Sequence, residues 1–416
     1  MILTVAFLDI FHGDCAVITF HEGSRKACIV IDGGEKRDAA RRLASYLKHE
    51  KIEIIDLLVA THIDSDHVNG LVHLLKSESD KSGSWNKGKK RCIVHYWGPK
   101  PDPKWIPPLR RKSVQVLPLA DPELQTKTFV IKSVAQNQKL SKLVETHIFQ
   151  TDNIRHPSLQ DIPTQIFESV KLEVMAPDMQ IFDSEIQSMA LNLSNVPYQR
   201  SLARNSPAGV KKRLKLEDLR RILATNAEEM AKIADRNANN QSIVLKLVPK
   251  EGETTKSCDW TFLFTGDAEQ ESWAMMKEVA QVKKNLPSRV LKVPHHGSSL
   301  HGIDNKSFKI INPEYCIISV GQRHGLPDAQ TLNIIKRGGK RKLFCTERNK
   351  SRHHPGPCMD KRRCIRKKNS DFRSIRFTID TETGKEKIDT FTIDKKKAEI
   401  EIKTGEIWCR EKKWST

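Results

Sequence analysis

The sequence of 416 residues has no apolar run of the roughly 20 residues that a membrane-spanning helix needs. Its first segment, Met1–Leu8, is apolar, but Asp9 follows too soon for a membrane span or a signal peptide, and no basic segment precedes it. We therefore expect a soluble protein without a membrane span, whose first residues form a buried strand.

The cysteines give no sign of a disulfide framework. There are nine, an odd number, scattered along the chain without secretory features, which indicates reduced thiols in a cytoplasmic protein. Cys345, Cys358 and Cys364 accompany His353 and His354, but the Cys-x₂-Cys pairs typical of zinc knuckles are missing. A small zinc site and ordinary thiols on a basic loop both remain open.

Acidic residues are too few to balance the basic ones. The 71 Lys and Arg against 51 Asp and Glu give a formal charge of +20, which favours a polyanionic partner such as nucleic acid or an acidic membrane face. A merely solvated basic surface is the alternative. Apolar residues make up 38% of the chain, a low share that is still globular, and the length allows one large α/β domain or two smaller ones.

The first part of the chain alternates short apolar runs with turn residues, as in consecutive strands of a mostly antiparallel sheet. A helix at Ala39–Leu47 and a buried strand at Ile54–Ala60 follow, and Val68–Leu75 is again helical. The polar residues between that strand and helix are therefore expected on a loop, where α/β folds place their chemistry. The opening strands are predicted at Thr4–Leu8, Ala16–Phe20 and Ala27–Ile31.

The rest of the chain extends the prediction to one large domain over residues 1–348, with insertions at about 77–170 and 199–235, the second basic and helical. The region 349–416 is predicted to be a basic C-terminal extension with short strands such as Ile375–Ile379 and Ala398–Ile402. Further elements are the strands Cys92–Tyr96, Ser242–Val248, Trp260–Phe264, Val290–Val293 and Tyr315–Val320, and helices after Glu269 and from Ala329.

Two histidines and two aspartates gather directly after the strand Ile54–Ala60, in His62-x-Asp64-x-Asp66-His67. Imidazole nitrogen and carboxylate oxygen are the ligands that Zn²⁺ and Mn²⁺ take at about 2.0–2.2 Å. One-residue spacers in a tight turn aim alternate side chains into one pocket, which favours a metal site. A solvated turn is the alternative.

Two later strands end in residues of the same kind. Trp260–Phe264 leads to Asp267, which is either a carboxylate that bridges two cations or a helix cap. Val290–Val293 leads to His295 and His296, and neighbouring side chains at a strand end face different ways. One histidine is therefore expected to bind metal while the other meets substrate or forms a hydrogen bond to a ligand residue, and we favour His296 as the metal ligand.

Together these motifs resemble the metallo-β-lactamase superfamily, and within it the soluble relatives of the hydrolase domain of the DNA-uptake channel protein ComEC. The resemblance implies an α/β fold, a four-layer αββα sandwich with metals at one edge. The matching stretches run in the family's order over nearly all of residues 1–348. They are Phe7–Cys15, Ile31–Gly34, the His62 cluster, Asn240–Leu245, Phe264–Asp267, Leu291–Ser299, Ile318–Gly321 and Cys345–Arg348.

The resemblance also implies two adjoining metal sites that hold one or two ions of Zn²⁺ or Mn²⁺ per chain. Its ligands fall on His62 and Asp64 for the first site, on Asp66, His67 and the His295/His296 pair for the second, and on Asp267 as the bridge.

The first site departs from the family pattern. Asp64 stands where much of the superfamily has a second histidine, and no clear third ligand is present, although Asn240 and Ser242 lie near where one is expected. An oxygen-rich site softens the preference for zinc, admits Mn²⁺, and is expected to bind its ion weakly. Two other departures affect substrate contacts: Phe11-His12 replaces a pattern of small residues after Asp9, and Leu326 stands where relatives often have histidine.

By the same resemblance, a metal-activated water attacks phosphorus, with Asp66 and His295 as catalytic residues. The sequence thus predicts a metal-dependent phosphodiesterase, a nuclease acting on DNA or RNA. One alternative is a hydrolase of small phosphoesters or carboxylic esters, and another is a binding or effector subunit with weak or lost catalysis. A role in defence against foreign DNA beside an ATPase partner is suggested by the family alone.

Nucleic-acid contacts are expected in the two most basic regions, since Lys and Arg side chains neutralise backbone phosphates. Solvated surface is the alternative there. The residues are Lys211, Lys212 and Arg213 in the second insertion, and Arg362 and Arg363 in the C-terminal extension.

Overall fold

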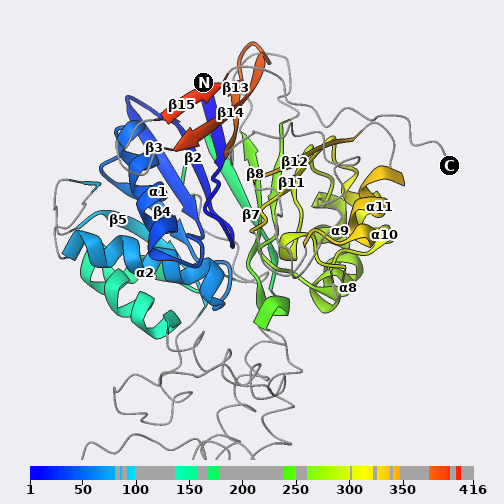
Figure 1. The fold of residues 1–416 in the computed structure, drawn as a ribbon, viewed down its shortest axis with the longest axis horizontal. Helices are drawn as coiled ribbons and strands as arrows, with labels where there is room; N and C mark the ends of the chain where they lie inside the picture. Colours follow the sequence, from blue (N-terminus) through cyan, green and yellow to red (C-terminus); the bar gives the residue numbers. More distant parts are fainter. Residues whose placement is uncertain are drawn as a thin grey trace, which may run out of the picture.

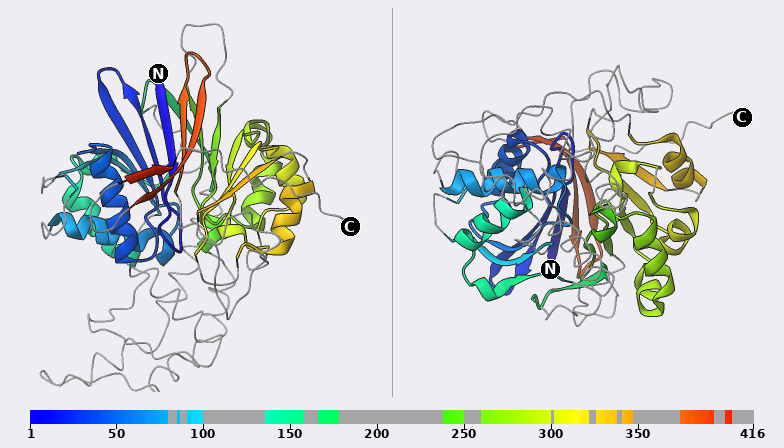
Figure 2. Two further views of the ribbon diagram at one scale, coloured as in Figure 1. Left: turned by 45° about the horizontal axis from the view of Figure 1, so that its top comes forward. Right: turned by 90° about the horizontal axis from the view of Figure 1, so that it is seen from below.

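The computed structural model describes residues 1–79, 85–86, 91–99, 136–157, 166–177, 238–249, 260–299, 302–321, 326–337, 341–346, 374–393 and 400–403. They form two sheets that lie face to face, each covered by helices on its outer side (Figure 1). The two further views show the same order of helices, sheet, sheet and helices (Figure 2). The fold is therefore the αββα sandwich predicted from the sequence.

The first sheet has nine strands in the order β15-β14-β13-β1-β2-β3-β4-β5-β6. Its strands pair antiparallel from β15 to β3 and parallel from β3 to β6. Helices α1 (Arg37–His49) and α2 (Ser65–Ser79) and the helical residues 136–147 cover its outer face (Figure 1). The strands are β1 (Ile2–Phe7), β2 (Ala16–Glu22), β3 (Arg25–Ile31), β4 (Ile55–Val59), β5 (Ile93–Trp97), β6 (Ile154–Arg155), β13 (Ser374–Asp380), β14 (Glu386–Ile393) and β15 (Ile400–Lys403).

The second sheet has six strands in the order β12-β11-β10-β9-β8-β7. Strands β7 to β9 pair antiparallel, and β9 to β12 pair parallel. Its strands are β7 (Val170–Ala176), β8 (Val244–Pro249), β9 (Phe262–Phe264), β10 (Val290–Lys292), β11 (Tyr315–Ile318) and β12 (Lys342–Cys345). The helices on its outer face are α8 (Gln270–Glu278), α9 (Ala280–Asn285), α10 (Asn305–Ile311) and α11 (Ala329–Arg337).

Alternating side chains of the buried strands build the layers of the core. In β11, Tyr315 and Ile317 belong to the apolar cluster between the two sheets, whereas Cys316 and Ile318 belong to the cluster under the helices. The same period of two sends Val290 of β10 into the space between the sheets. A strand that is buried on both faces has apolar residues at nearly every position, and these continuous apolar runs allowed the strands to be predicted from the sequence.

The described parts of the stretch 77–170 extend the first sheet. Strand β5 pairs parallel with β4, residues 136–147 form a helix, and β6 then pairs parallel with β5. Residues predicted as an insertion therefore add two strands to the main sheet. The basic insertion of residues 199–235 lies outside the described residues.

The last strands also belong to the first sheet. Strand β13 pairs with β1 over six residue pairs, from Ile2 opposite Asp380 to Phe7 opposite Ile375. Phe377 of β13 lies fully buried between the sheets, in edge contact with the ring of Phe7. The boundary predicted at residue 348 thus does not separate these strands from the N-terminal sheet.

Two other expectations concern whole regions of the chain. None of the helices within the described ranges is long and apolar enough to cross a membrane. Cys345 lies partly buried on β12, while Cys358, Cys364, His353 and His354 fall outside the described residues, so the zinc knuckle stays open.

Candidate metal centre

The first metal-binding motif lies where the sequence predicts it, between a strand and a helix. Strand β4 ends at Val59, and α2 begins at Ser65. Asp66 and His67 therefore stand in the first turn of α2. Gly13 packs against this turn so closely that a Cβ atom there would lie 1.9 Å from the backbone oxygen of Asp66, and its φ of +105° also favours glycine.

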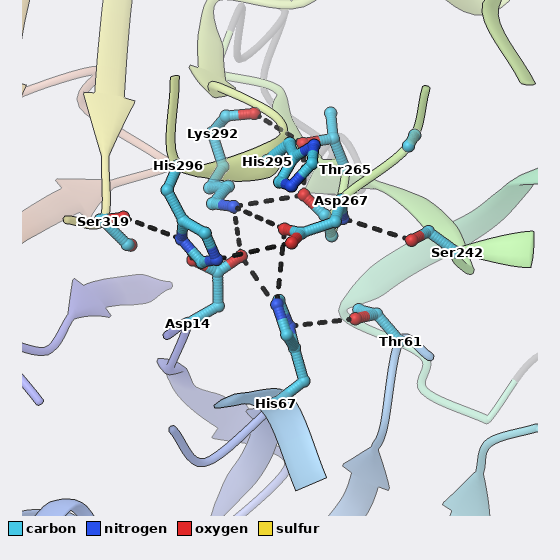
Figure 3. Close-up of polar contacts among 12 residues, drawn as sticks. Asp14, Thr61, His67, Ser242, Thr265, Asp267, Lys292, His295, His296 and Ser319 are labelled. Atoms are coloured by element: carbon cyan, nitrogen blue, oxygen red, sulfur yellow. Dashed lines mark hydrogen bonds and ion pairs between the residues drawn. The ribbon is translucent and has the colours of Figure 1, made fainter. Parts of the chain in front are cut away.

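Four buried side chains from both sheets converge at one edge of the sandwich. They come from the start of α2, from the turn after β9 and from the turn after β10, and Figure 3 shows three of them pointing toward one another. Their nearest oxygen and nitrogen atoms all lie within 4.8 Å of one another. The four residues are Asp66, His67, Asp267 and His296.

The spacing of these atoms suits a divalent cation. Nε2 of His296 lies 3.1 Å from Oδ2 of Asp66 and 3.3 Å from Oδ2 of Asp267, and Nε2 of His67 lies 3.3 Å from Oδ1 of Asp267. Ligands of a tetrahedral ion at about 2.0–2.2 Å are separated by about 3.4 Å. Two imidazoles and two carboxylates form a donor set that both Zn²⁺ and Mn²⁺ accept.

Buried polar atoms that form no hydrogen bond also indicate a cation site. Among the residues that the structure describes, Nε2 of His67 and Oδ1 of Asp267 are buried without a hydrogen-bond partner. Burying such atoms without a partner is unfavourable, and a shared cation would satisfy both. The residues present therefore fit a divalent metal ion.

Without a cation, protons balance the charge of the cluster. Burial lowers the pKa of His67, but the carboxylates of Asp267, Asp32 and Asp66 outweigh it and hold that pKa well above its usual value. The pKa of His296 is raised in the same way, chiefly by Asp267 against the effect of burial. Both imidazoles must give up a proton before they bind a metal ion.

A second layer of hydrogen bonds fixes the two imidazole rings. Nδ1 of His67 lies 2.8 Å from Oδ2 of Asp32, and Nδ1 of His296 lies 2.9 Å from the backbone oxygen of Ser319. Because both partners accept, each Nδ1 carries the hydrogen and each Nε2 presents its lone pair to the cluster once deprotonated. Asp32 belongs to the Ile31–Gly34 motif, which gives this motif a role in orienting His67.

A hydrogen bond and close packing also fix the turn that carries Asp267. The backbone N–H of Asp267 donates to Oγ of Ser242 at 3.1 Å (Figure 3). Gly266 has a φ of +51°, and a Cβ atom there would lie 2.8 Å from Oγ1 of Thr61. Ser242, near which a further ligand was expected, thus supports the turn of Asp267.

The residues predicted for the first metal site form a smaller group. Nε2 of His62 lies 3.8 Å from Oδ2 of Asp64, and the His62 ring centre lies 4.0 Å from that of His67. Burial and the neighbouring His67 lower the pKa of His62 to about 3, so this imidazole is neutral and ready to bind a cation. The structure places the pair beside the four-residue cluster, with Asp64 partly exposed.

His295 lies apart from the cluster, on the more exposed side of the loop. Its side chain is 27% exposed, against 3% for His296, and its Nδ1 lies 3.0 Å from Oε1 of the buried Glu269. Oε1 of Glu269 also accepts from Nδ2 of Asn239 at 3.0 Å. Such a supported, accessible imidazole can meet a substrate, as predicted for one of the two histidines.

Asp14 and Lys292 were not predicted as parts of this region. Asp14 and Lys292 lie buried beneath the cluster, and Nε2 of His12 lies 3.3 Å from Oδ2 of Asp66. A charged Lys292 inside an otherwise apolar strand was the available signal, because a buried charge requires a partner. Asp14 follows Gly13 and resembles an ordinary turn residue.

The predicted nucleic-acid contacts cannot be placed in the fold. Lys211, Lys212, Arg213, Arg362 and Arg363 all lie outside the described residues. Their role stays a prediction.

Comparison with known proteins identifies part of the chain. No curated protein matches it. A sequence model described as the metallo-beta-lactamase superfamily matches residues 8–84, the region that includes the loop before α2 and the candidate ligands Asp66 and His67. Residues 8–84 are therefore a metallo-beta-lactamase superfamily domain, of the superfamily of metal-dependent hydrolases, and the buried His and Asp cluster fits a divalent metal.

Proposed function

We propose that the chain is a metal-dependent phosphodiesterase that cleaves nucleic acid. The observation that carries the proposal is the buried cluster of Asp66, His67, Asp267 and His296, whose atoms have the spacing of metal ligands. The narrower resemblance to soluble relatives of the ComEC hydrolase domain belongs to this proposal, as do Zn²⁺ or Mn²⁺ as the ion.

The cluster residues would hold the metal, and the pair His62 and Asp64 offers a second, weaker position. A bound divalent ion supplies Lewis acidity, which activates water as a nucleophile and offsets negative charge on phosphate. Nε2 of His296 lies 3.1 Å from Oδ2 of Asp66, so the carboxylate of Asp66 faces the centre of the site.

His295 is the residue of this loop best placed to contact the substrate. It is the more exposed histidine of the pair, and the buried Glu269 holds its ring. An imidazole in this position can donate a hydrogen bond to a phosphate oxygen or to the leaving oxygen of a phosphodiester.

The choice of nucleic acid rests on charge. A formal charge of +20 attracts polyanions, and phosphate contacts would make the affinity fall steeply with salt. Contacts through Lys211, Lys212, Arg213, Arg362 and Arg363, an ATPase partner and a role in defence are parts of the proposal that rest on sequence and family resemblance.

The test is cleavage of single- and double-stranded DNA and RNA by purified protein loaded with Mn²⁺ or Zn²⁺. We expect cleavage by the wild type and none by Asp66→Ala/His67→Ala. The matched control is Asp304→Asn, which removes a carboxylate that caps α10 away from the site and should keep activity. A metal-loaded wild type that cleaves no nucleic acid would refute the proposal.

One observation favours a second candidate, a binding or effector subunit with weak catalysis. The predicted first site brings together His62 and Asp64, and Asp64 replaces an expected histidine. Metal-loaded protein that binds nucleic acid but hydrolyses neither it nor small phosphodiesters or carboxylic esters would support this candidate. Hydrolysis of small esters alone would instead indicate a small-molecule hydrolase.

A further inference from the structure

Lys292 is a buried cation directly beneath the metal centre. It is the last residue of β10, its side chain is 4% exposed, and its neighbours Leu291 and Val293 are apolar and fully buried. An ammonium group in such a place is stable only with partners of opposite charge or strong acceptors. The contacts of the Lys292 ammonium group therefore indicate its role.

The ammonium of Lys292 joins two segments that the metal centre needs. It forms an ion pair with Oδ2 of Asp14, donates to the backbone oxygen of Gly266 at 3.1 Å, and lies 3.8 Å from Oδ1 of Asp267 (Figure 3). Gly266 precedes a predicted metal ligand, so the lysine holds the turn that presents that ligand.

Asp14 connects the lysine to the imidazole ligands. Its Oδ1 lies 3.4 Å from Nδ1 of His296, and its Oδ2 lies 4.0 Å from Nδ1 of His67. Its carboxylate thus approaches both rings from the side opposite their Nε2 atoms. Asp14, Asp32 and His67 also form a second buried group whose donor atoms lie within 4.8 Å of one another.

We propose that Lys292 is a positioning residue of the metal centre, whose ammonium holds Asp14 and the Gly266-Asp267 turn where a divalent cation requires them. Its ammonium lies under four buried carboxylates, so it also offsets part of their mutual repulsion when metal is absent. The four carboxylates belong to Asp14, Asp32, Asp66 and Asp267. The inference rests on the proposed metal centre and assigns a role to residues outside its ligand set.

The alternative is an ion pair that merely stabilises the fold, and a double variant separates the two. Lys292→Met leaves Asp14 buried without its partner, so it lowers both stability and metal affinity on either account. Lys292→Met/Asp14→Asn removes both charges and should recover stability. If the pair positions the site, metal affinity stays low in the double variant.

The measurement is calorimetric titration of the metal-free full-length protein with Mn²⁺, with the unfolding temperature recorded on the same samples. Loss of a residue that supports metal ligands typically lowers affinity by about 10- to 100-fold, and we expect this for both variants. The control is Lys246→Met, which removes another buried lysine, one that bonds the backbone oxygen of Asn285 at 2.7 Å outside the site, and should leave affinity unchanged.

Each outcome decides the inference. A double variant that regains stability but remains at least about tenfold weaker for Mn²⁺ supports it. A double variant with wild-type affinity overturns it, even if Lys292→Met itself does not fold. If the double variant also does not fold, Lys292→Gln/Asp14→Asn, a neutral pair that keeps a donor and an acceptor, decides by the same comparison of affinity. A wild type that binds no Mn²⁺ refutes the metal centre itself, which distinguishes the two failures.

Discussion

Substitution of Asp32 tests how a buried carboxylate orients the candidate metal ligand His67. Its buried carboxylate accepts three hydrogen bonds, from the backbone N–H of Thr61 at 2.8 Å, from Oγ1 of Thr61 at 2.7 Å and from Nδ1 of His67 at 2.8 Å. Two of these bonds converge on Oδ2. The carboxylate thereby selects the form of His67 whose Nε2 faces the cluster.

Asp32→Asn keeps the size of this side chain and replaces one acceptor oxygen by a donor. If the amide nitrogen faces His67, the ring must place its hydrogen on Nε2 and cannot bind a cation. If the amide nitrogen faces the N–H of Thr61, the amide oxygen still accepts from Nδ1 of His67, but this acceptor no longer carries a charge. We therefore expect metal affinity to fall by about 10- to 100-fold, or about 1.4–2.7 kcal/mol.

Titration of metal-free protein with Mn²⁺ measures this loss directly. The matched control is Asp56→Asn, since Oδ2 of the buried Asp56 accepts from the backbone N–H of Cys28 at 2.8 Å, at the start of β4 and away from the ligands. Both variants should lose stability, but Asp56→Asn should keep its affinity. Equal affinities of Asp32→Asn and the wild type would show that Asp32 does not orient His67.

Two further predictions concern protonation and the core. Because the pKa values of His67 and His296 are raised in the fold, their protonated forms stabilise the metal-free protein fully below about pH 6.5, and this stability is lost as pH rises through the raised values. Apparent Mn²⁺ affinity should rise over the same window, since binding displaces those protons, and titrations at several pH values that give constant affinity would contradict this. Phe377→Ala should lower the free energy of unfolding by about 3–5 kcal/mol in denaturant titration, because this fully buried ring packs against both sheets, and a loss below about 1 kcal/mol would contradict the integral position of β13.

Most of the individual elements could be predicted from the sequence, because buried strands of both sheets are continuous apolar runs. The pairing of β13 with β1 could not, since alternation shows that a segment is a strand but names no partner. The two strands lie more than 350 residues apart, and only burial between the sheets brings them together.

The residues of the buried cluster could be recognised as candidate ligands because each follows an apolar strand within a few residues, where side chains leave the sheet. The choice between His295 and His296 depended on the backbone, which turns through positive φ at both residues and buries only the second. Supporting residues were harder to recognise. Asp14 resembles a turn residue and Lys292 an irregularity in a strand, and only their contact in space reveals a pair.

The position of β1 in the sheet affects how the nascent chain can fold during translation. While the ribosome extends the chain, β1 can pair with β2, but its other edge has no partner until Ser374–Asp380 has been made. An unpaired strand edge can recruit other chains, and contacts between distant segments form slowly. We therefore expect this edge of β1 to lack its native partner through most of translation, a period in which chaperone protection would matter most.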